Sequence, residues 1–522
     1  MSQKRLLDLP IGIQTFEELR KNNFLYVDKT KDVYEFARIK TPCFLARPRR
    51  FGKSILCTTF KALFEGKKHL FEGTWIANSD WQWQEHPIIH IDINTLVFES
   101  PTELRCALQD MLHTMAKQHH VVLPQKAPGA MLQMLVKELA IPGKAQPVVL
   151  IDEYDKPIVN NLSKPRLLKA YREMLYNFYT PLKSLDTAMR FLFITGVSQV
   201  GRLSVFSALN HLNILSNAPK AATLCGYTQT DLEYNFAEYL DCAAKKLTFT
   251  KEHLLAEIKH WYNGYCFTIP EDAPDKVYNP FSVLNFFENL QFKNYWFESG
   301  TSTFAIEFFK KHKFSLTDFT GVHASGSQLN SLNPEKLSLT TVLYQTGYLT
   351  IKSFTDRQFI LGFPNQEVAE SCSAGLLDLF EENASTPLLT YAQQLRNLFV
   401  SNKVTESDLE IILKKICAHI PSVVAPTKER GYQLAFYLVL QLVGLNVTVE
   451  EPTAIGRIDA VIITENTIFV LELKIRGSAT KALEQIEEKR YDEKYRDLGK
   501  QIIRIGAVFD IKKRTITACK IL

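Results

Sequence analysis

Residues 456–474, GRIDAVIITENTIFVLELK, contain two β-rich runs on either side of the polar pair Glu465–Asn466. Two such runs around a two-residue polar connection predict a β-hairpin. With Glu465 and Asn466 as the loop, paired positions add up to 931, which places Asp459 opposite Glu472. Directly opposed Cβ atoms are about 4.5–5.5 Å apart, and Lys474 shares a strand face with Glu472. The register therefore predicts that Asp459, Glu472 and Lys474 form one cluster.

Two carboxylates at that distance repel each other unless a cation lies between them. Their hard oxygen ligands suit Mg²⁺ or Mn²⁺, and a metal held by Asp459 and Glu472 would activate water and stabilise charge on a phosphodiester. Lys474 would orient that water or neutralise the transition state. The alternative is an exposed hairpin with ordinary surface charges, because Glu-x-Lys on a strand is common by chance. The register-matched Asp459 favours the metal site.

The charge distribution is uneven along the chain. The fifty residues after Glu472 contain thirteen Lys or Arg and seven Asp or Glu, a net charge of +6, whereas the whole chain carries +5. A basic segment on a near-neutral body suits a polyanion such as nucleic acid. The other interpretation is a solvated helix face that balances local acids.

Residues 42–54, PCFLARPRRFGKS, combine an apolar run, an arginine-rich loop and the ending Gly52-Lys53-Ser54. In a P-loop, amides at the helix N-terminus hold phosphate, the lysine reaches the β and γ phosphates, and the serine ligates Mg²⁺. Arg47 replaces the first glycine of G-x-x-x-x-G-K-[ST], so the pattern is degenerate. We predict that the nucleotide contacts are made by Arg49, Arg50, Phe51, Gly52, Lys53 and Ser54. For the two arginines, packing or surface roles stay open.

An apolar run at 148–151 ends in Asp152-Glu153. This is the Walker B arrangement, in which Asp152 holds the Mg²⁺ shell and Glu153 polarises the attacking water. A plain solvated loop is the alternative, and the Lys-Ser loop upstream argues against it. A third run, 191–195, leads into Thr195-Gly196-Val197-Ser198. We expect Thr195 or Ser198 to contact the γ-phosphate of the nucleotide at the end of this run. The alternative is a simple strand-to-loop turn.

A chain of 522 residues predicts two or three domains. Short apolar runs at 42–46, 88–93, 148–151 and 191–195 alternate with helical patterns at 54–64, 103–118 and 166–179, which indicates a layered α/β domain with a buried sheet. Residues 228–402 are predicted to be mostly helical. Residues 403–522 follow the order helix, helix, strand, strand, helix, strand, strand. The predicted domains are 1–227, 228–402 and 403–522.

Cysteine usage and hydropathy bear on the compartment. The nine cysteines form no CxxC pair and no Cys/His cluster at zinc spacing, and no signal peptide precedes them. This pattern predicts reduced thiols in a cytoplasmic protein. The most apolar run, 434–449, is interrupted by polar residues and is too short to span a bilayer. It predicts a buried helix followed by a strand, with no membrane partner.

The sequence resembles a bacterial family in which an AAA-ATPase-like N-terminal domain precedes a C-terminal PD-(D/E)XK nuclease-superfamily domain. The likeness covers nearly the whole chain, and the missing P-loop glycine is typical of the family. It is carried by the segments 9–13 (LPIGI), 26–30 (YVDKT), 47–54 (RPRRFGKS), 152–153 (DE), 195–198 (TGVS), 261–265 (WYNGY) and 279–282 (NPFS). The resemblance implies an ASCE/AAA-like P-loop sheet domain and a restriction-endonuclease-like α/β/α domain.

The resemblance also assigns residues at the C-terminal site. Glu429 corresponds to the helix-borne acid that precedes the hairpin and joins Asp459 and Glu472 as a metal ligand. The catalytic core is Asp459, Glu472 and Lys474, and Gln485 corresponds to a helix residue beside the metal. From the residues alone, Gln485 on a charged helix would be a surface position.

The functional hypothesis is an ATP-regulated, Mg²⁺- or Mn²⁺-dependent nuclease that hydrolyses phosphodiester bonds of DNA, with a role in defence or DNA processing. DNA is favoured over RNA, and ATP is favoured over GTP through the family. The alternative is an ATP-dependent nucleic-acid-binding or signalling switch that does not cut. Such a switch would bind DNA with an affinity that falls steeply as salt rises. The sequence carries no signal for an oligomeric state.

Overall fold

The structure is a computed structural model of the full chain. It describes residues 6–522 except residues 163, 200–205, 207–211, 273–274, 299–319, 330–337, 381–386, 419–436, 438, 441–444, 454–455, 475–476, 511–512 and 514. The chain packs into two compact units, Met1–Phe304 with His323–Asn365, and Ala305–Val322 with Gln366–Leu522. The predicted division into three domains, with boundaries after residues 227 and 402, stays a prediction.

The N-terminal unit is built on a parallel five-stranded sheet in the order β2-β3-β4-β1-β5. The strands are β1 (Cys43–Ala46), β2 (Ile88–Asp92), β3 (Val148–Asp152), β4 (Phe191–Gly196) and β5 (Asn213–Ile214). The first four confirm the four predicted strands to within one residue at each end. β4 lies between β1 and β3, so the carboxyl ends of all three strands meet at one edge of the sheet.

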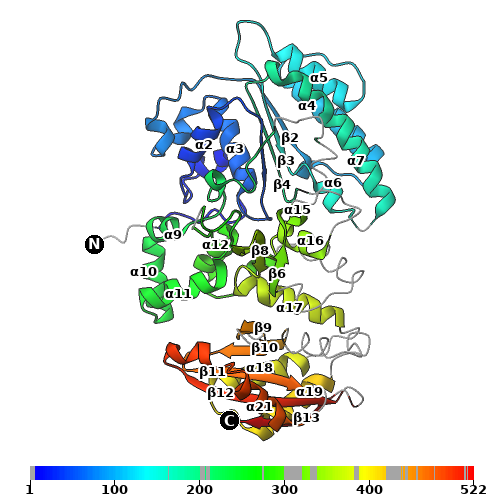
Figure 1. The fold of residues 1–522 in the computed structure, drawn as a ribbon. Helices are drawn as coiled ribbons and strands as arrows, with labels where there is room; N and C mark the ends of the chain where they lie inside the picture. Colours follow the sequence, from blue (N-terminus) through cyan, green and yellow to red (C-terminus); the bar gives the residue numbers. More distant parts are fainter. Residues whose placement is uncertain are drawn as a thin grey trace, which may run out of the picture. The chain divides into compact units, whose positions relative to one another are not determined.

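Helices cover both faces of this sheet. α2 (Thr30–Ala37) and α3 (Lys53–Phe64) lie on one face, while α4 (Pro101–Gln118), α5 (Pro128–Leu139) and α7 (Pro165–Tyr179) lie on the other (Figure 1). β1, β3 and β4 are buried along their whole length, as expected for strands covered on both faces. The core against α4, α5 and α7 includes Leu108, Leu132, Ile151 and Leu175. The predicted helices at 54–64, 103–118 and 166–179 are confirmed. The short helices of this region are α1 (Phe16–Lys21) and α6 (Lys156–Val159).

The region after residue 227 is mostly helical, as predicted, but it also contains strands that the sequence did not predict. The helices are α9 (Gln229–Asn235), α10 (Ala237–Leu247), α11 (Lys251–Tyr262), α12 (Pro280–Asn289), α13 (Tyr295–Glu298), α15 (Gly326–Leu329) and α16 (Leu339–Thr346). α9 to α12 share an aromatic-rich core with Leu25 and Val27 from the N-terminal segment. The added strands are β6 (Thr320–Ala324), β7 (Thr350–Thr355) and β8 (Gln358–Gly362), in the order β6-β8-β7.

The C-terminal unit contains a five-stranded sheet in the order β13-β12-β11-β10-β9. Its strands are β9 (Asn446–Thr453), β10 (Gly456–Ile463), β11 (Thr467–Lys474), β12 (Gln501–Asp510) and β13 (Thr515–Ile521). Its helices are α17 (Gln366–Phe380), α18 (Pro387–Val400), α19 (Glu406–Ala418) and α21 (Ala479–Glu488). The predicted element order for 403–522 has only two strands before the last helix, whereas the structure has three. The strand that this order leaves out, β9, overlaps the one predicted at the end of the 434–449 run.

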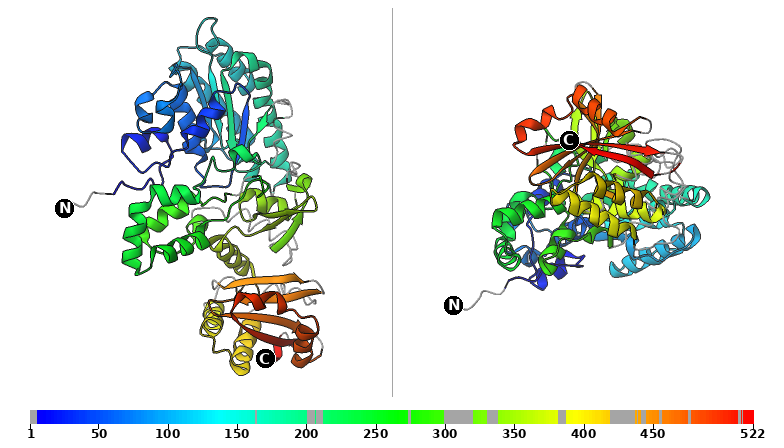
Figure 2. Two further views of the ribbon diagram at one scale, coloured as in Figure 1. Left: turned by 60° about the vertical axis from the view of Figure 1, so that its left-hand side comes forward. Right: turned by 90° about the horizontal axis from the view of Figure 1, so that it is seen from below.

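The C-terminal sheet is covered on both faces. Leu483 and Ile486 of α21 pack against Ile468 and Val470, while on α18 the ring of Phe399 lies 4.9 Å from Phe469. Figure 2 shows α21 on one side of the sheet and α18 and α19 on the other. β11 is therefore a central strand buried on both faces, and its last residues, Glu472 and Lys474, point toward the α21 side.

The structure also bears on the expectations for membrane spans and for the cysteines. Among the helices that the structure describes, none combines the length and the apolar character needed to cross a bilayer. All nine cysteines are free thiols.

α21 packs so closely on β12 that Gly506 has no room for a side chain. A Cβ at this position would lie 2.3 Å from the carbonyl oxygen of Ala479. We expect Gly506→Ala to destabilise the C-terminal unit by about 1–3 kcal/mol, because helix or strand must move apart. Urea unfolding measures the change. The control is Gly326→Ala, where the nearest atom, on Phe359, lies 3.7 Å away. Equal stability changes in both variants would contradict the close packing.

Candidate nucleotide and metal sites

The predicted P-loop connects β1 to α3 and lines a cavity of about 460 Å³. Gly52 is the N-cap of α3 and has a left-handed backbone, with φ +87°. Glycine adopts this conformation without strain, so the chain can turn sharply and expose the first amides of α3. Free amides at a helix N-terminus form an anion site. All six predicted contact residues, from Arg49 to Ser54, line the cavity.

Lys53 is buried at the floor of this cavity. Its Nζ lies 3.2 Å from the carbonyl oxygen of Pro48 and 3.3 Å from Oε1 of Glu153. Glu153 has a left-handed backbone, with φ +53°, which is uncommon for a residue with a side chain. The two contacts use two of the three donors of the ammonium group and hold it beside the loop.

The acids at the ends of β2 and β3 lie side by side, because Asp92 and Asp152 are partners in the parallel register. Burial raises the pKa of Asp152 to about 7, and the negative charge of Glu153 adds to the increase, while hydrogen bonding with Ser54 opposes it. Burial also raises the pKa of Asp92. The Ser54–Asp152 pair places a hydroxyl and a carboxylate together, which fits the coordination of Mg²⁺ beside a bound triphosphate.

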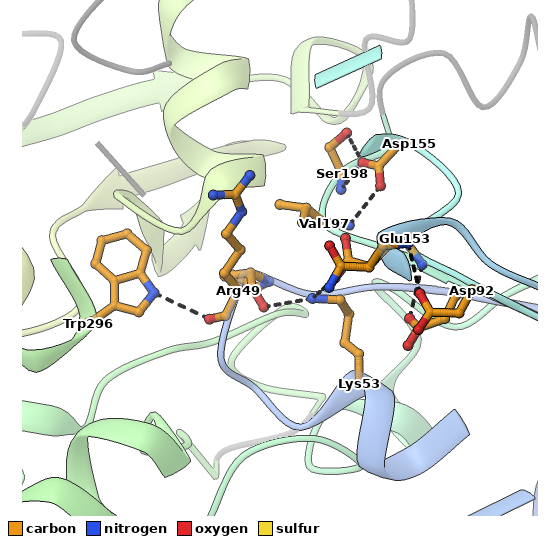
Figure 3. A network of polar contacts seen from close by, with 11 residues as sticks. Arg49, Lys53, Asp92, Glu153, Asp155, Val197, Ser198 and Trp296 are labelled. Atoms are coloured by element: carbon orange, nitrogen blue, oxygen red, sulfur yellow. Dashed lines mark hydrogen bonds and ion pairs between the residues drawn. The ribbon is translucent and has the colours of Figure 1, made fainter. Parts of the chain in front are cut away.

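The two candidate sensor residues, Thr195 in β4 and Ser198 just after it, differ in their surroundings. Ser198 donates from both its amide and its hydroxyl to Asp155, at 2.7 Å each, and Val197 donates to the same carboxylate (Figure 3). Ser198 is therefore engaged in holding Asp155. The Thr195 hydroxyl is buried and has no hydrogen-bond partner among the described residues. Thr195 is fully buried, however, and is not among the residues that line the cavity, so its predicted contact with the γ-phosphate stays a prediction.

Arg47, which replaces the first P-loop glycine, is almost completely buried. Its guanidinium donates to the carbonyl oxygens of Ala46, Ser216 and Ala221 at 2.7–3.0 Å and lies 4.0 Å from the ring of Phe267. Burial lowers its pKa to about 10. The arginine therefore fixes the start of the loop by side-chain bonds, in place of the backbone freedom that a glycine provides.

The next four loop residues, 48–51, contact residues of the helical region after residue 227. A Cβ on Gly347 would lie 2.7 Å from Pro48. Trp296 Nε1 donates to the Arg49 carbonyl at 3.3 Å, and the Arg49 guanidinium points away from Lys53 (Figure 3). The Arg50 guanidinium lies 4.6 Å from the ring of Phe281, and Phe51 packs edge-on against Tyr265. These contacts hold residues 48–51 of the loop in place.

The C-terminal hairpin has the predicted register. Ala460 pairs with Leu471 and Ile463 with Ile468, so paired positions add up to 931 and Glu465–Asn466 form the loop. Beyond the last ladder pair, Oδ2 of Asp459 accepts a hydrogen bond from the Leu473 amide at 2.7 Å. Asp459 is therefore held at the end of the hairpin next to Glu472.

Glu472 is the centre of a buried polar cluster. Its Oε1 accepts hydrogen bonds from Lys474 Nζ, at 3.1 Å, and from the Gln485 amide, which also bonds to Lys474. Its Oε2 is buried and has no hydrogen-bond partner in the described part of the chain. Burial raises the pKa of Glu472 to about 7, and the charge of Asp459 adds to the increase. The structure therefore brings together four of the predicted residues, including Gln485.

The unpartnered Oε2 is the observation that tests whether these residues fit a metal. An ionised oxygen buried without a donor is costly, and a divalent cation would satisfy it and the neighbouring Asp459 together. Within the described ranges, no group of three or more His, Cys, Asp or Glu is placed to hold a metal. One or two carboxylates with substrate phosphate are the usual Mg²⁺ set, so the pair fits. Glu429, the third predicted ligand, lies outside the described residues.

Comparisons with known proteins agree with this geometry. Residues 10–206 match a family model described as a predicted AAA-ATPase, and residues 427–519 match one described as the PD-(D/E)XK nuclease superfamily. An uncharacterized protein from the vnfD 5′ region of Azotobacter chroococcum mcd 1 is 32% identical over 530 residues, which cover 99% of this chain and 98% of the relative. The chain belongs to this AAA-ATPase-like family with a C-terminal PD-(D/E)XK nuclease-superfamily domain.

Two acids of the AAA-like domain were missed in the sequence. Asp92 ends β2 as Asp152 ends β3, so the rule that parallel strands end at one edge would have found it. Asp155 follows the Walker B pair by two residues and becomes a structural acceptor only through its bonds to the β4 loop. Nothing in the local sequence indicates that contact.

Restoring the first P-loop glycine of the AAA-like domain is expected to damage the site. Arg47→Gly removes the side-chain donor from three carbonyl groups and opens a cavity, so we expect a loss of about 2–4 kcal/mol in unfolding free energy and weaker nucleotide binding. Thermal unfolding and nucleotide titration measure both. Arg357→Gly is the matched control, since Arg357 is exposed and already has φ +61°. A stable Arg47→Gly protein with tighter nucleotide binding would disprove the anchoring role.

The nuclease-superfamily domain should become more stable without metal when Glu472 is neutralised. Because its folded pKa is raised, Glu472 destabilises the fold once the pH exceeds its unfolded pKa, and the full cost is present above pH 7. In EDTA at pH 8, we expect Glu472→Gln to stabilise the domain by on the order of 2 kcal/mol. At pH 4 the gain should vanish. Calorimetric unfolding tests this, with the exposed Glu484→Gln as control; destabilisation at pH 8 would contradict it.

Proposed function

We propose that the protein is a divalent-metal-dependent nuclease that hydrolyses phosphodiester bonds of DNA and is regulated by ATP at its P-loop. The observation that supports the nuclease most strongly is the buried cluster of Asp459, Glu472, Lys474 and Gln485. In it, one oxygen of Glu472 has no hydrogen-bond donor among the residues that the structure describes. A structural cluster would be expected to satisfy that oxygen, whereas a metal site leaves it open.

The residues of the cluster have separable roles in this proposal. Asp459 and Glu472 would hold the cation, which supplies Lewis-acid polarisation of the phosphate and a water of lowered pKa. Gln485 bonds to both Glu472 and Lys474 and so fixes their side chains. Lys474 is about a quarter exposed and its ammonium group lies beside Glu472, where it would stabilise the charge that a phosphate gains in the transition state. DNA as the substrate agrees with the basic charge of the last fifty residues.

Regulation by ATP is supported by the contacts of the P-loop. Phosphate binding at Lys53 competes with Glu153 and Pro48, and the loop's other residues are held by Trp296, Phe281 and Gly347. A shift of the loop would therefore change its contacts with α12, α13 and the Gly347 turn that precedes β7. Glu153 would polarise the attacking water if ATP is also hydrolysed.

The test is cleavage of single-stranded, duplex and plasmid DNA, and of RNA, by the wild type and by Glu472→Gln. We expect Mg²⁺ or Mn²⁺ to support cutting, EDTA to abolish it, and Glu472→Gln to lower it at least a hundredfold while DNA binding persists. Glu484→Gln should cut like the wild type. Each reaction is run with and without ATP, and Lys53→Ala should remove any response to ATP.

The alternative is an ATP-dependent switch that binds nucleic acid without cutting it. It is the better account if wild type and Glu472→Gln both bind DNA, with affinity that falls steeply with salt, and neither cuts any substrate with either metal. That outcome would contradict the nuclease proposal. The effect of ATP would then be measured on DNA binding instead of on cleavage.

A further inference from the structure

We propose that Asp155 is a positioning residue for ATP hydrolysis, because it fixes the backbone that carries Glu153. This inference rests on the proposed function, in which Glu153 polarises the attacking water. In that reaction the water oxygen bonds to the γ-phosphorus, its proton passes to the Glu153 carboxylate, and the bond from phosphorus to the ADP oxygen breaks. Asp155 follows Glu153 by two residues, is completely buried and belongs to the wall of the nucleotide cavity.

The backbone at Glu153 has an unfavourable conformation. Its φ is +53°, in the left-handed region that residues with a Cβ seldom occupy. A conformation of this kind persists only where the surrounding structure determines it. With this backbone, the Glu153 side chain lies in the cavity, and its Oε1 is 3.3 Å from Nζ of Lys53. The contacts that hold the segment therefore also hold the carboxylate that would act on water.

The hydrogen bonds of the Glu153 backbone are local. Its amide donates to Oδ1 of Asp152 at 3.0 Å, and its carbonyl accepts from the Lys156 amide at 3.1 Å. Bonds within one short turn do not fix the turn relative to the sheet. On the side of β2, Lys156 Nζ donates to the Asn94 carbonyl at 2.9 Å, through a long and flexible side chain. The shorter connection to the sheet is on the side of β4.

Residues 154 and 155 are bound to the end of β4 and the loop that follows it. The Tyr154 amide donates to the Thr195 carbonyl at 3.1 Å, and its hydroxyl donates to the Ser198 carbonyl at 3.0 Å. Oδ1 of Asp155 accepts from the Val197 amide at 3.1 Å. Oδ2 accepts from both the amide and the hydroxyl of Ser198 at 2.7 Å (Figure 3). Both oxygens of the carboxylate thus hold the turn after β3 against the loop after β4.

The contact between the two strand ends is close enough to require a glycine. A Cβ on Gly196 would lie 2.3 Å from Oδ1 of Asp155 and 2.6 Å from Cδ1 of Tyr154. It also requires a carboxylate, because donors approach both oxygens and an amide side chain has only one acceptor oxygen. Position 155 is therefore specific for an acid, although this acid is buried away from solvent.

The location of β4 explains why this contact matters for the reaction. β4 lies between β3, which ends in the Walker B acids, and β1, which leads into the P-loop. Asp155 therefore fixes Glu153 relative to the strand next to the phosphate site. A water that Glu153 polarises reacts efficiently only when it is held at the correct distance from the γ-phosphate. Loss of the Asp155 contact should lower the rate of hydrolysis and leave nucleotide affinity unchanged.

The test measures ATP hydrolysis and calorimetric ATP binding by the full chain with Mg²⁺. In Asp155→Asn an amino group replaces one acceptor oxygen and faces a donor, so we expect kcat to fall at least about thirtyfold while Kd changes less than about twofold. Because Asp155 acts through Glu153, adding Asp155→Asn to Glu153→Gln should lower kcat by no more than about threefold further. The exposed Asp110→Asn is the matched control and should behave like the wild type.

A milder variant keeps the test possible if Asp155→Asn does not fold. Ser198→Ala removes the hydroxyl donor and keeps both amide donors to Asp155, so we expect kcat to fall about threefold with an unchanged Kd. In the Glu153→Gln background this loss should disappear. Losses that multiply in either double variant, or equal weakening of Kd and kcat, would overturn the positioning role.

Crystal structures without nucleotide provide a readout that does not depend on activity. We expect the Glu153 backbone to leave the left-handed region in Asp155→Asn, and to remain there in Asp110→Asn. An unchanged φ at Glu153 in Asp155→Asn would contradict the proposal. If the wild type binds ATP but does not hydrolyse it, the ATPase function fails, whereas the φ of Glu153 in these structures still decides whether Asp155 positions it.

Discussion

The buried guanidinium of Arg47 is the constraint on which the nucleotide site depends. A P-loop normally turns at its first glycine, and here a large cation occupies that position. Its bonds to the carbonyls of Ser216 and Ala221 and its contact with Phe267 fix the loop by side-chain packing. Burying a guanidinium is costly unless its donors are satisfied. Two of the three carbonyls that accept its hydrogen bonds come from the segment after β5, so the shape of the loop depends on chain that lies well beyond the sheet's central strands.

The C-terminal cluster differs from the Arg47 site, because one oxygen of Glu472 has no hydrogen-bond partner among the described residues. Glu472 and Asp459 carry like charges at the end of a hairpin, and burial opposes the ionisation of Glu472. Such an arrangement costs stability, which proteins accept where chemistry requires it. Lys474 and Gln485 both donate to one oxygen of Glu472, and in the described part of the chain nothing donates to the other. The scaffold around them is conventional, with β11 buried on both faces.

The strands and the hairpin register could be predicted from the sequence, because they depend on local patterns of apolar and turn residues. The apolar runs of β1 to β4 have few alternatives, and a two-residue loop determines every pair of the β10–β11 hairpin, including the position of Asp459.

Roles that depend on contacts between residues far apart in the chain could not be predicted from the sequence. The roles of Arg47 and Asp155 arise from carbonyls and amides far along the chain. β6 to β8 were missed within a region of helical pattern. Gln485 was found only through family resemblance, since its position on a charged helix indicates a surface residue. Glu429, the remaining predicted metal ligand, lies outside the described residues.

The anchoring of Arg47 also bears on how the nucleotide-binding part can be excised. The match to the AAA-like family ends at residue 206, before β5 and before the carbonyls of Ser216 and Ala221. A fragment cut at that point would leave the Arg47 guanidinium with only the Ala46 carbonyl of its three acceptors, and would lack the edge strand, Trp296 and the ring of Phe281. The smallest piece that keeps the contacts of this loop is therefore longer than the recognisable homology, and extends at least to Gly347.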